Sequence, residues 1–144
     1  MPMLDDPLND IEDEDGWIPG ADASAEPPPL VYRNVEDWVT RYLAPHICRR
    51  LGGAATWCPW WWRHAEAISR LTALWTAWEH QRTQGALGMS QWWIYHADPH
   101  LAVLLSKDAG PFASCKPDRH TEIAPLPCEP APQGLWAGEA FSEA

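Results

Sequence analysis

Tryptophan is concentrated in the middle of this 144-residue chain. Nine of its eleven Trp residues lie between Tyr32 and Cys115. Each buried Trp side chain removes about 150–250 Å² from water, which stabilises a fold by up to roughly 4–6 kcal/mol. A segment so rich in Trp can form a core without disulfides, so we expect one small folded domain in this part of the chain.

Charge and proline divide the chain in the same way. Residues 1–29 contain nine acidic and no basic residues, and residues 116–144 contain five acidic and two basic ones. The middle, residues 30–115, has eight basic and six acidic residues, so the net charge of −10 belongs to the ends. Eleven of the fifteen Pro residues also lie in the ends, which bury too little apolar surface to offset their ordering entropy. The sequence therefore predicts a disordered acidic N-terminal tail (1–29), a helical domain (30–115) and a disordered Pro-rich C-terminal tail (116–144).

Apolar spacing predicts an all-α bundle of three main helices and one short helix. The first helix begins after Asn34, a favourable N-cap, and ends or bends at Pro45. The second has Pro59 at its first position and ends between residues 82 and 85. Ser90 caps the third helix, and the pair Asp98-Pro99 predicts a separate fourth helix that runs to about residue 106. No alternating run of β-branched residues occurs, so we expect no substantial sheet.

Two Cys and two His residues of the central segment form a candidate metal site. Cys58, His64, His100 and Cys115 would supply two thiolates and two imidazoles to a structural zinc ion. The chain has no C-x-x-C pair, and Cys58 and His64 are too far apart in the sequence to share one face of a regular helix. Buried thiols with hydrogen-bonded core histidines are the alternative. A disulfide between Cys58 and Cys115 is a further alternative, which a reducing cytosol disfavours.

Consecutive Trp residues cannot all point into one core, because neighbours on a helix are about 100° apart. Such residues are either buried by a second neighbouring element or exposed as anchors for a protein partner. Basic residues near the end of the first helix form a candidate patch, on which the acidic residues 5–15 are a candidate internal ligand. The candidate interaction residues are Trp61, Trp62, Trp92, Trp93, Arg49 and Arg50, with Arg41 beside the last two.

The sequence contains no complete catalytic motif. It has no G-x-S-x-G, H-E-x-x-H or phosphate-binding Gly loop. Residues 90–106 contain no Arg or Lys, which argues against direct DNA reading by the third helix. No apolar run is long enough to span a membrane, and the first residues lack the features of a signal peptide, so we expect a cytoplasmic protein with no membrane partner.

These observations predict a non-enzymatic module that binds a protein partner. A structural-zinc or DNA-associated accessory protein is the alternative. An enzyme with Cys58 as a thiol nucleophile is a third hypothesis, because a helix N-terminus lowers a thiol pKa and His64 is a candidate base.

A run of short motifs follows one order along the central segment. They are Trp57-Cys58-Pro59, WWRHAEA (61–67), LWTAWE (74–79), MSQWW (89–93), HADPH (96–100) and GPFASC (110–115). This order resembles an uncharacterised actinobacterial family, domain of unknown function 4913, over about residues 31–115. The resemblance implies an actinobacterial source and a gene of a plasmid, phage or conjugative element, and it implies no reaction. The family-like residues available for a site are Cys58, His64, Glu66, Trp93, Asp98 and Cys115.

Overall fold

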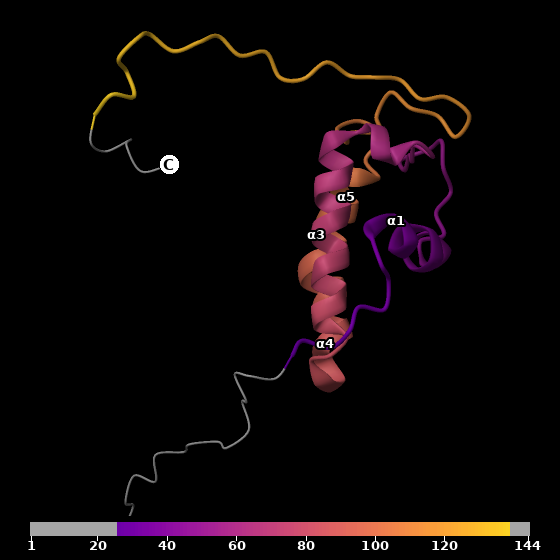
Figure 1. Cartoon of the computed structure of the whole chain (residues 1–144). Helices are drawn as coiled ribbons and strands as arrows, with labels where there is room; N and C mark the ends of the chain where they lie inside the picture. Colours follow the sequence, from indigo (N-terminus) through magenta and orange to yellow (C-terminus); the bar gives the residue numbers. More distant parts are fainter. Residues whose placement is uncertain (1–25, 139–144) are drawn as a thin grey trace, which may run out of the picture.

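The computed structural model describes residues 26–138, which form three helical stretches (Figure 1). The first joins α1 (Val35–Trp38), the π-helical η1 (Val39–Leu43) and α2 (Ala44–His46). The second is a 3-10 turn, η2 (Trp61–Arg63), followed by the long α3 (Ala65–Gln81). The third joins η3 (Gly85–Leu87), α4 (Gly88–Gln91), the π-helical η4 (Trp92–Ala97) and α5 (Asp98–Leu104).

The all-α class with three main helices is confirmed for the described residues. They contain isolated β-bridges but no strand. No helix within 26–138 combines the length and apolarity that crossing a bilayer requires. The disorder predicted for residues 1–25 and 139–144 lies outside the described part of the chain.

The core of the bundle is aromatic, as the Trp content predicts. Trp38 and Trp92 are fully buried, and their rings meet edge to face with centroids 6.0 Å apart. The Trp92 indole N–H donates to the Leu74 carbonyl oxygen at 3.0 Å, so its polar atom is satisfied inside the core. Other buried apolar residues come from all three helical stretches and the loops: Val39, Leu43, Cys58, Trp61, Ala67, Leu71, Leu74, Trp78, Ala97, Leu101, Leu104, Phe112 and Cys115.

Two prolines lie inside helices, each two residues after a π-helical turn. Before Pro45 the Ala44 N–H bonds the Val39 carbonyl, and before Pro99 the Asp98 N–H bonds the Trp93 carbonyl. In a regular α-helix, the proline ring would clash with the carbonyl of the residue four positions earlier. The wider π-helical turn moves that carbonyl away from the ring. Pro45 therefore does not end the first helix before His46. The short helix predicted after Asp98 forms as α5, but it continues α4 and η4 without a break.

A side-chain cap explains the start of α1 but not those of α3 and α4, and Ser90, the predicted N-cap of the third helix, lies inside α4. Asn34 caps α1 as predicted, since its Oδ1 accepts the Asp37 N–H at 2.8 Å. The second helix begins later than Pro59 predicts: His64 is the N-cap, in an extended conformation, and α3 starts at Ala65. Burial of both Cys58 and Trp61 holds residues 58–63 in a separate turn. This turn, not a regular helix, connects Cys58 to His64.

A buried carboxylate fastens the N-terminal segment to the end of α3. Glu79 is only 7% exposed and accepts the backbone N–H groups of Val31 and Tyr32, each at 3.0 Å. Arg82 donates from Nε to Glu79 at 2.9 Å and from Nη2 to the Pro29 carbonyl at 2.6 Å. Burial alone would raise the pKa of Glu79, but the two N–H groups and Arg82 bring it below its ordinary value.

Gly110 allows the loop after α5 to pack against the end of that helix. A Cβ at this position would lie 2.3 Å from the Val103 carbonyl oxygen and 2.8 Å from that of Ser106. Backbone atoms cannot rotate away, so Gly110→Ala is expected to destabilise the protein by about 1–3 kcal/mol. Denaturant unfolding measures this loss. Gly53→Ala is the control, because nothing lies within 4 Å of its added Cβ. Equal stability of both variants would show that the loop rearranges freely.

Candidate metal centre

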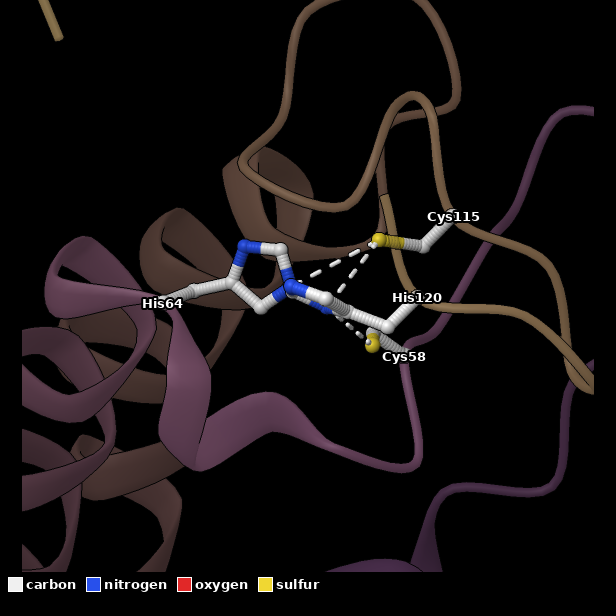
Figure 2. Close-up of side chains that lie close together, drawn as sticks. All are labelled: Cys58, His64, Cys115 and His120. Carbon is white, nitrogen blue, oxygen red and sulfur yellow. Dashed lines mark hydrogen bonds between the residues drawn. The ribbon is translucent and has the colours of Figure 1, made fainter. Parts of the chain in front are cut away.

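Four metal-ligating side chains meet beside the start of α3 (Figure 2). Cys58 precedes the η2 turn, His64 caps α3, Cys115 ends the loop after α5, and His120 follows five residues later. One ligand atom of each residue can be chosen so that all four lie within 4.8 Å of one another. Two segments that lie about 50 residues apart in the sequence, 58–64 and 115–120, therefore converge on one point.

The spacing of these atoms suits a tetrahedral ion. With ordinary Zn–S and Zn–N bond lengths, ligand atoms of a tetrahedral zinc site are about 3.3–3.8 Å apart. Here Cys58 Sγ lies 3.5 Å from His120 Nδ1, and Cys115 Sγ lies 3.5 Å from His64 Nε2. Cys115 Sγ lies 3.9 Å from His120 Nδ1. The donor set could therefore hold an ion after only small side-chain movements.

Local packing holds Cys115 and His64 in place. The Cys115 N–H donates to the Phe112 carbonyl oxygen at 2.9 Å, and Thr56 Oγ1 donates to the Cys115 carbonyl at 3.4 Å. Phe112 is fully buried, and its ring meets the His64 ring edge to face at 5.0 Å. The candidate metal centre therefore packs directly against the hydrophobic core.

Burial controls the protonation of the site. It raises the pKa of the Cys58 thiol to about 11; the neighbouring Cys115 adds to this shift and a hydrogen bond from the Trp60 backbone opposes it. Burial also lowers the pKa of His64, as do the nearby His120 and Arg63. A neutral imidazole is the form that binds metal. A raised pKa leaves less thiolate at neutral pH, and the thiolate is the form of a cysteine that acts as a nucleophile.

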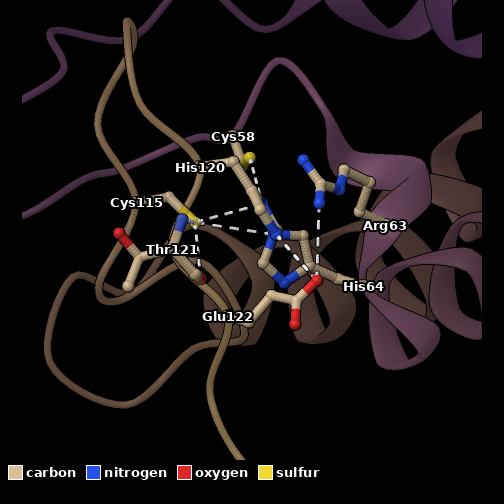
Figure 3. Close-up of polar contacts among 7 residues, drawn as sticks. All are labelled: Cys58, Arg63, His64, Cys115, His120, Thr121 and Glu122. Carbon is tan, nitrogen blue, oxygen red and sulfur yellow. Dashed lines mark hydrogen bonds and ion pairs between the residues drawn. The ribbon is translucent and has the colours of Figure 1, made fainter.

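Polar groups surround the four side chains (Figure 3). The Thr121 N–H donates to Cys115 Sγ at 3.4 Å. Glu122 Oε1 lies 3.8 Å from the outer ring nitrogen of His120 and 3.5 Å from Arg63 Nη2. Ligating histidines commonly have a carboxylate near the nitrogen that does not face the metal. His120 Nε2 is buried without a hydrogen bond, and Glu122 is the carboxylate beside it.

A family model described as Domain of unknown function (DUF4913) matches residues 32–132. The chain belongs to the DUF4913 family. No curated protein and no solved structure gives a match. The match extends past Cys115, so the DUF4913 domain includes His120, and the domain boundary expected at residue 115 falls inside the candidate metal centre.

Three of the four residues predicted as zinc ligands come together in this DUF4913 domain, and His100 does not. His100 lies on α5, where Arg70 Nη1 donates to its Nδ1 at 3.0 Å. Arg70 also pairs with Glu66 at 2.7 Å across one helical turn. His120 takes the fourth place. Its signal in the sequence is a repeated spacing, because Cys58-x5-His64 is matched by Cys115-x4-His120.

The predicted interaction residues of the DUF4913 domain separate into buried and exposed groups. Trp61 and Trp92 are 7% and 0% exposed, so they are core residues and unavailable as anchors. Trp93 is half-buried against the core. Trp62 is 54% exposed and lines a surface hollow of about 380 Å³ together with Trp61, Val35 and Ile68. Arg49 and Arg50 are both exposed.

Proposed function

We propose that this chain is a small structural zinc-binding domain with no catalytic activity of its own. One observation carries the proposal: two Cys and two His side chains gather with all four ligand atoms within 4.8 Å. Two thiolates and two imidazoles in a tetrahedral arrangement are a donor set that zinc prefers. Four protein ligands leave no coordination position for a substrate, which favours a structural role over a catalytic one.

Zinc at this position would join two parts of the fold that are distant in the sequence. Cys58 and His64 flank the η2 turn, whereas Cys115 and His120 follow the last helix, more than 50 residues further along the chain. An ion bound by all four would close this long loop and hold residues 115–122 against the start of α3. The segment after Cys115 forms no helix, so the ion would replace the packing that this segment lacks.

The second part of the proposal is that the domain binds a protein partner. The exposed hollow at Trp62 supports this role, because Trp62 is 54% and Ile68 40% exposed beside Val35. DNA reading has less support, since helix residues 88–104 contain no Arg or Lys. The actinobacterial mobile-element origin and the cytoplasmic location stay predictions from the family resemblance and the sequence.

Metal content of the purified full chain tests the zinc proposal. We expect about one zinc per wild-type chain after zinc reconstitution and desalting. His120→Gln removes a ligand and is expected to lose most of the bound zinc. His100→Gln is the matched control, because His100 contacts Arg70 away from the centre. Plasma mass spectrometry of both variants measures the difference.

Two results would contradict the proposal. One is a wild-type zinc content at background level after reconstitution. The other is equal zinc content in the His120→Gln and His100→Gln variants, which would place the ion elsewhere. Circular dichroism of each variant shows whether the helices are retained, so loss of metal is distinguished from loss of fold.

A further inference from the structure

An apolar groove on the domain is lined by residues of the first helical stretch and of α5, and by none of the four residues of the candidate metal centre. Two hollows of about 180 and 530 Å³ share Arg49, Leu101 and Leu105 as lining residues and together form this Arg49 groove. Its remaining apolar walls include the end of the first helix and the loop that follows it: Leu43, Ala44, Ile47, Leu51 and Trp57. The first hollow is mostly apolar with one cation, Arg49, at its edge, and the second hollow also contains the carboxylate Asp98. The groove therefore fits an apolar segment whose negative charge lies on the Arg49 side.

The cations near this groove have no carboxylate partner within residues 26–138. Arg49 and Arg50 are exposed, and Arg49 Nη1 donates only to the neighbouring Cys48 carbonyl. Lys107 directly follows the groove residue Ser106, and its Nζ donates to the Gly52 carbonyl at 3.2 Å. Four other arginines, Arg33, Arg63, Arg70 and Arg82, each lie within 4 Å of an Asp or Glu oxygen, whereas Arg41 lies over the Tyr32 ring.

We propose that the acidic N-terminal segment of this same chain, residues 4–15, docks in the Arg49 groove. This segment contains seven acidic and no basic residues. Apolar Leu4, Leu8 and Ile11 are placed among the acidic residues, so the segment offers both an apolar surface and negative charge. The segment therefore complements the groove in two ways. Its apolar side chains fit the apolar walls of the groove, and its carboxylates face Arg49, Arg50 and Lys107.

Chain length permits this docking, and tethering favours it. Ten residues, 16–25, lie between the acidic segment and the first described residue, Glu26, and each spans up to about 3.3 Å. A segment tied to its site has an effective concentration in the millimolar range, so it occupies the groove ahead of a dilute acidic partner. The docked segment would act as an internal competitor that a partner must displace. This inference is independent of the proposed zinc centre.

Zero-length crosslinking of the full chain tests the docking. A carbodiimide joins a carboxylate to a lysine amine, and the chain contains only two lysines, Lys107 and Lys116. Lys107 is beside the groove and Lys116 follows Cys115, so Lys116 serves as an internal control. We expect crosslinks from residues 5–15 to Lys107 in the monomer band, few to Lys116, and a marked loss at high salt. Peptide mass spectrometry identifies the linked residues.

A tail variant separates specific docking from plain charge attraction. Leu8→Asn/Ile11→Asn keeps every reactive carboxylate and leaves the described domain unchanged. We expect the Lys107 crosslink to fall roughly fivefold or more, because two apolar contacts are lost. Arg49→Gln is expected to reduce the same crosslink, whereas Arg119→Gln, a matched exposed arginine away from the groove, should not.

Three outcomes would overturn the proposal. Crosslinks of equal yield at Lys107 and Lys116 would show diffuse attraction. A yield unaffected by Leu8→Asn/Ile11→Asn would show that the apolar walls take no part. Crosslinks to Lys107 that occur only in covalent dimers would assign the groove to a second copy of the chain.

Discussion

Removal of zinc with a chelator is expected to lower the melting temperature of the full chain by about 15–30 °C. An ion present at a thousandfold excess over its dissociation constant stabilises the folded state by about 4 kcal/mol. For a folded unit of this size, each kcal/mol shifts the melting temperature by about 4–8 °C. Thermal circular dichroism with and without chelator measures the shift. Zinc added back should restore the original melting temperature, which would exclude damage by the chelator.

A pair of cysteine variants shows whether this effect belongs to the candidate metal centre. Cys115→Ser removes a buried ligand and should melt at the same temperature with and without chelator. Cys48→Ser changes an exposed free thiol outside the centre and should retain the wild-type response. If Cys115→Ser kept the chelator-dependent shift, the stabilising ion would not be bound at these four residues.

Glu79→Gln is expected to destabilise the domain by about 2–4 kcal/mol. The carboxylate accepts two backbone N–H groups and the Arg82 guanidinium, and it is buried with a side-chain exposure of 6%. A neutral amide leaves Arg82 without its charge partner and one N–H group without an acceptor. Urea unfolding measures the change in free energy. Glu129→Gln, which removes the same charge from the exposed C-terminal segment, is the control and should be neutral.

The Glu79 contacts also predict a loss of stability in acid. The pKa of Glu79 is lowered in the folded state, so the folded protein holds its proton less tightly than the unfolded chain does. Its contribution is complete above the ordinary glutamate pKa and decreases as the pH falls through the lowered, folded value. The wild type should therefore lose more stability over this acid range than Glu79→Gln does. Parallel pH curves for the two proteins would contradict this assignment.

Local rules predict the parts of the fold that depend on local chemistry. The N-cap at Asn34 follows from one side chain and one backbone N–H, and both are visible in the sequence. The pairing of Glu66 with Arg70 follows in the same way from residues within one turn, and α3 ends at Gln81, just before the predicted range of residues 82–85. By contrast, the start of α3 depends on burial of Trp61 and Cys58 by distant segments, which no local pattern contains.

The sequence predicts the ligand types of the candidate metal centre, two Cys and two His, but only three of its four residues. Cys58, His64 and Cys115 stand out because they are soft ligands in an apolar segment. His120 lies three residues after Pro117 in a segment whose composition predicts disorder. Composition cannot identify a single residue that tertiary contacts hold in place. His100 belongs to the same set of ligand types in the sequence, yet α5 directs its side chain to Arg70 and not to the metal centre.

The paired π-helical turns change how related sequences should be searched for this fold. Trp38 lies five residues before Leu43 and seven before Pro45, and Trp92 has the same spacing to Ala97 and Pro99. Each helix therefore contains one inserted residue, and its apolar stripe changes register there. A search for apolar residues at a constant period of 3.6 residues would detect each apolar stripe only as two short segments with a weak signal. Both helices would be detected by the pattern Trp-x4-aliphatic-x-Pro, in which the aliphatic residue is buried. The Trp of this pattern is the residue whose ring meets its counterpart in the core.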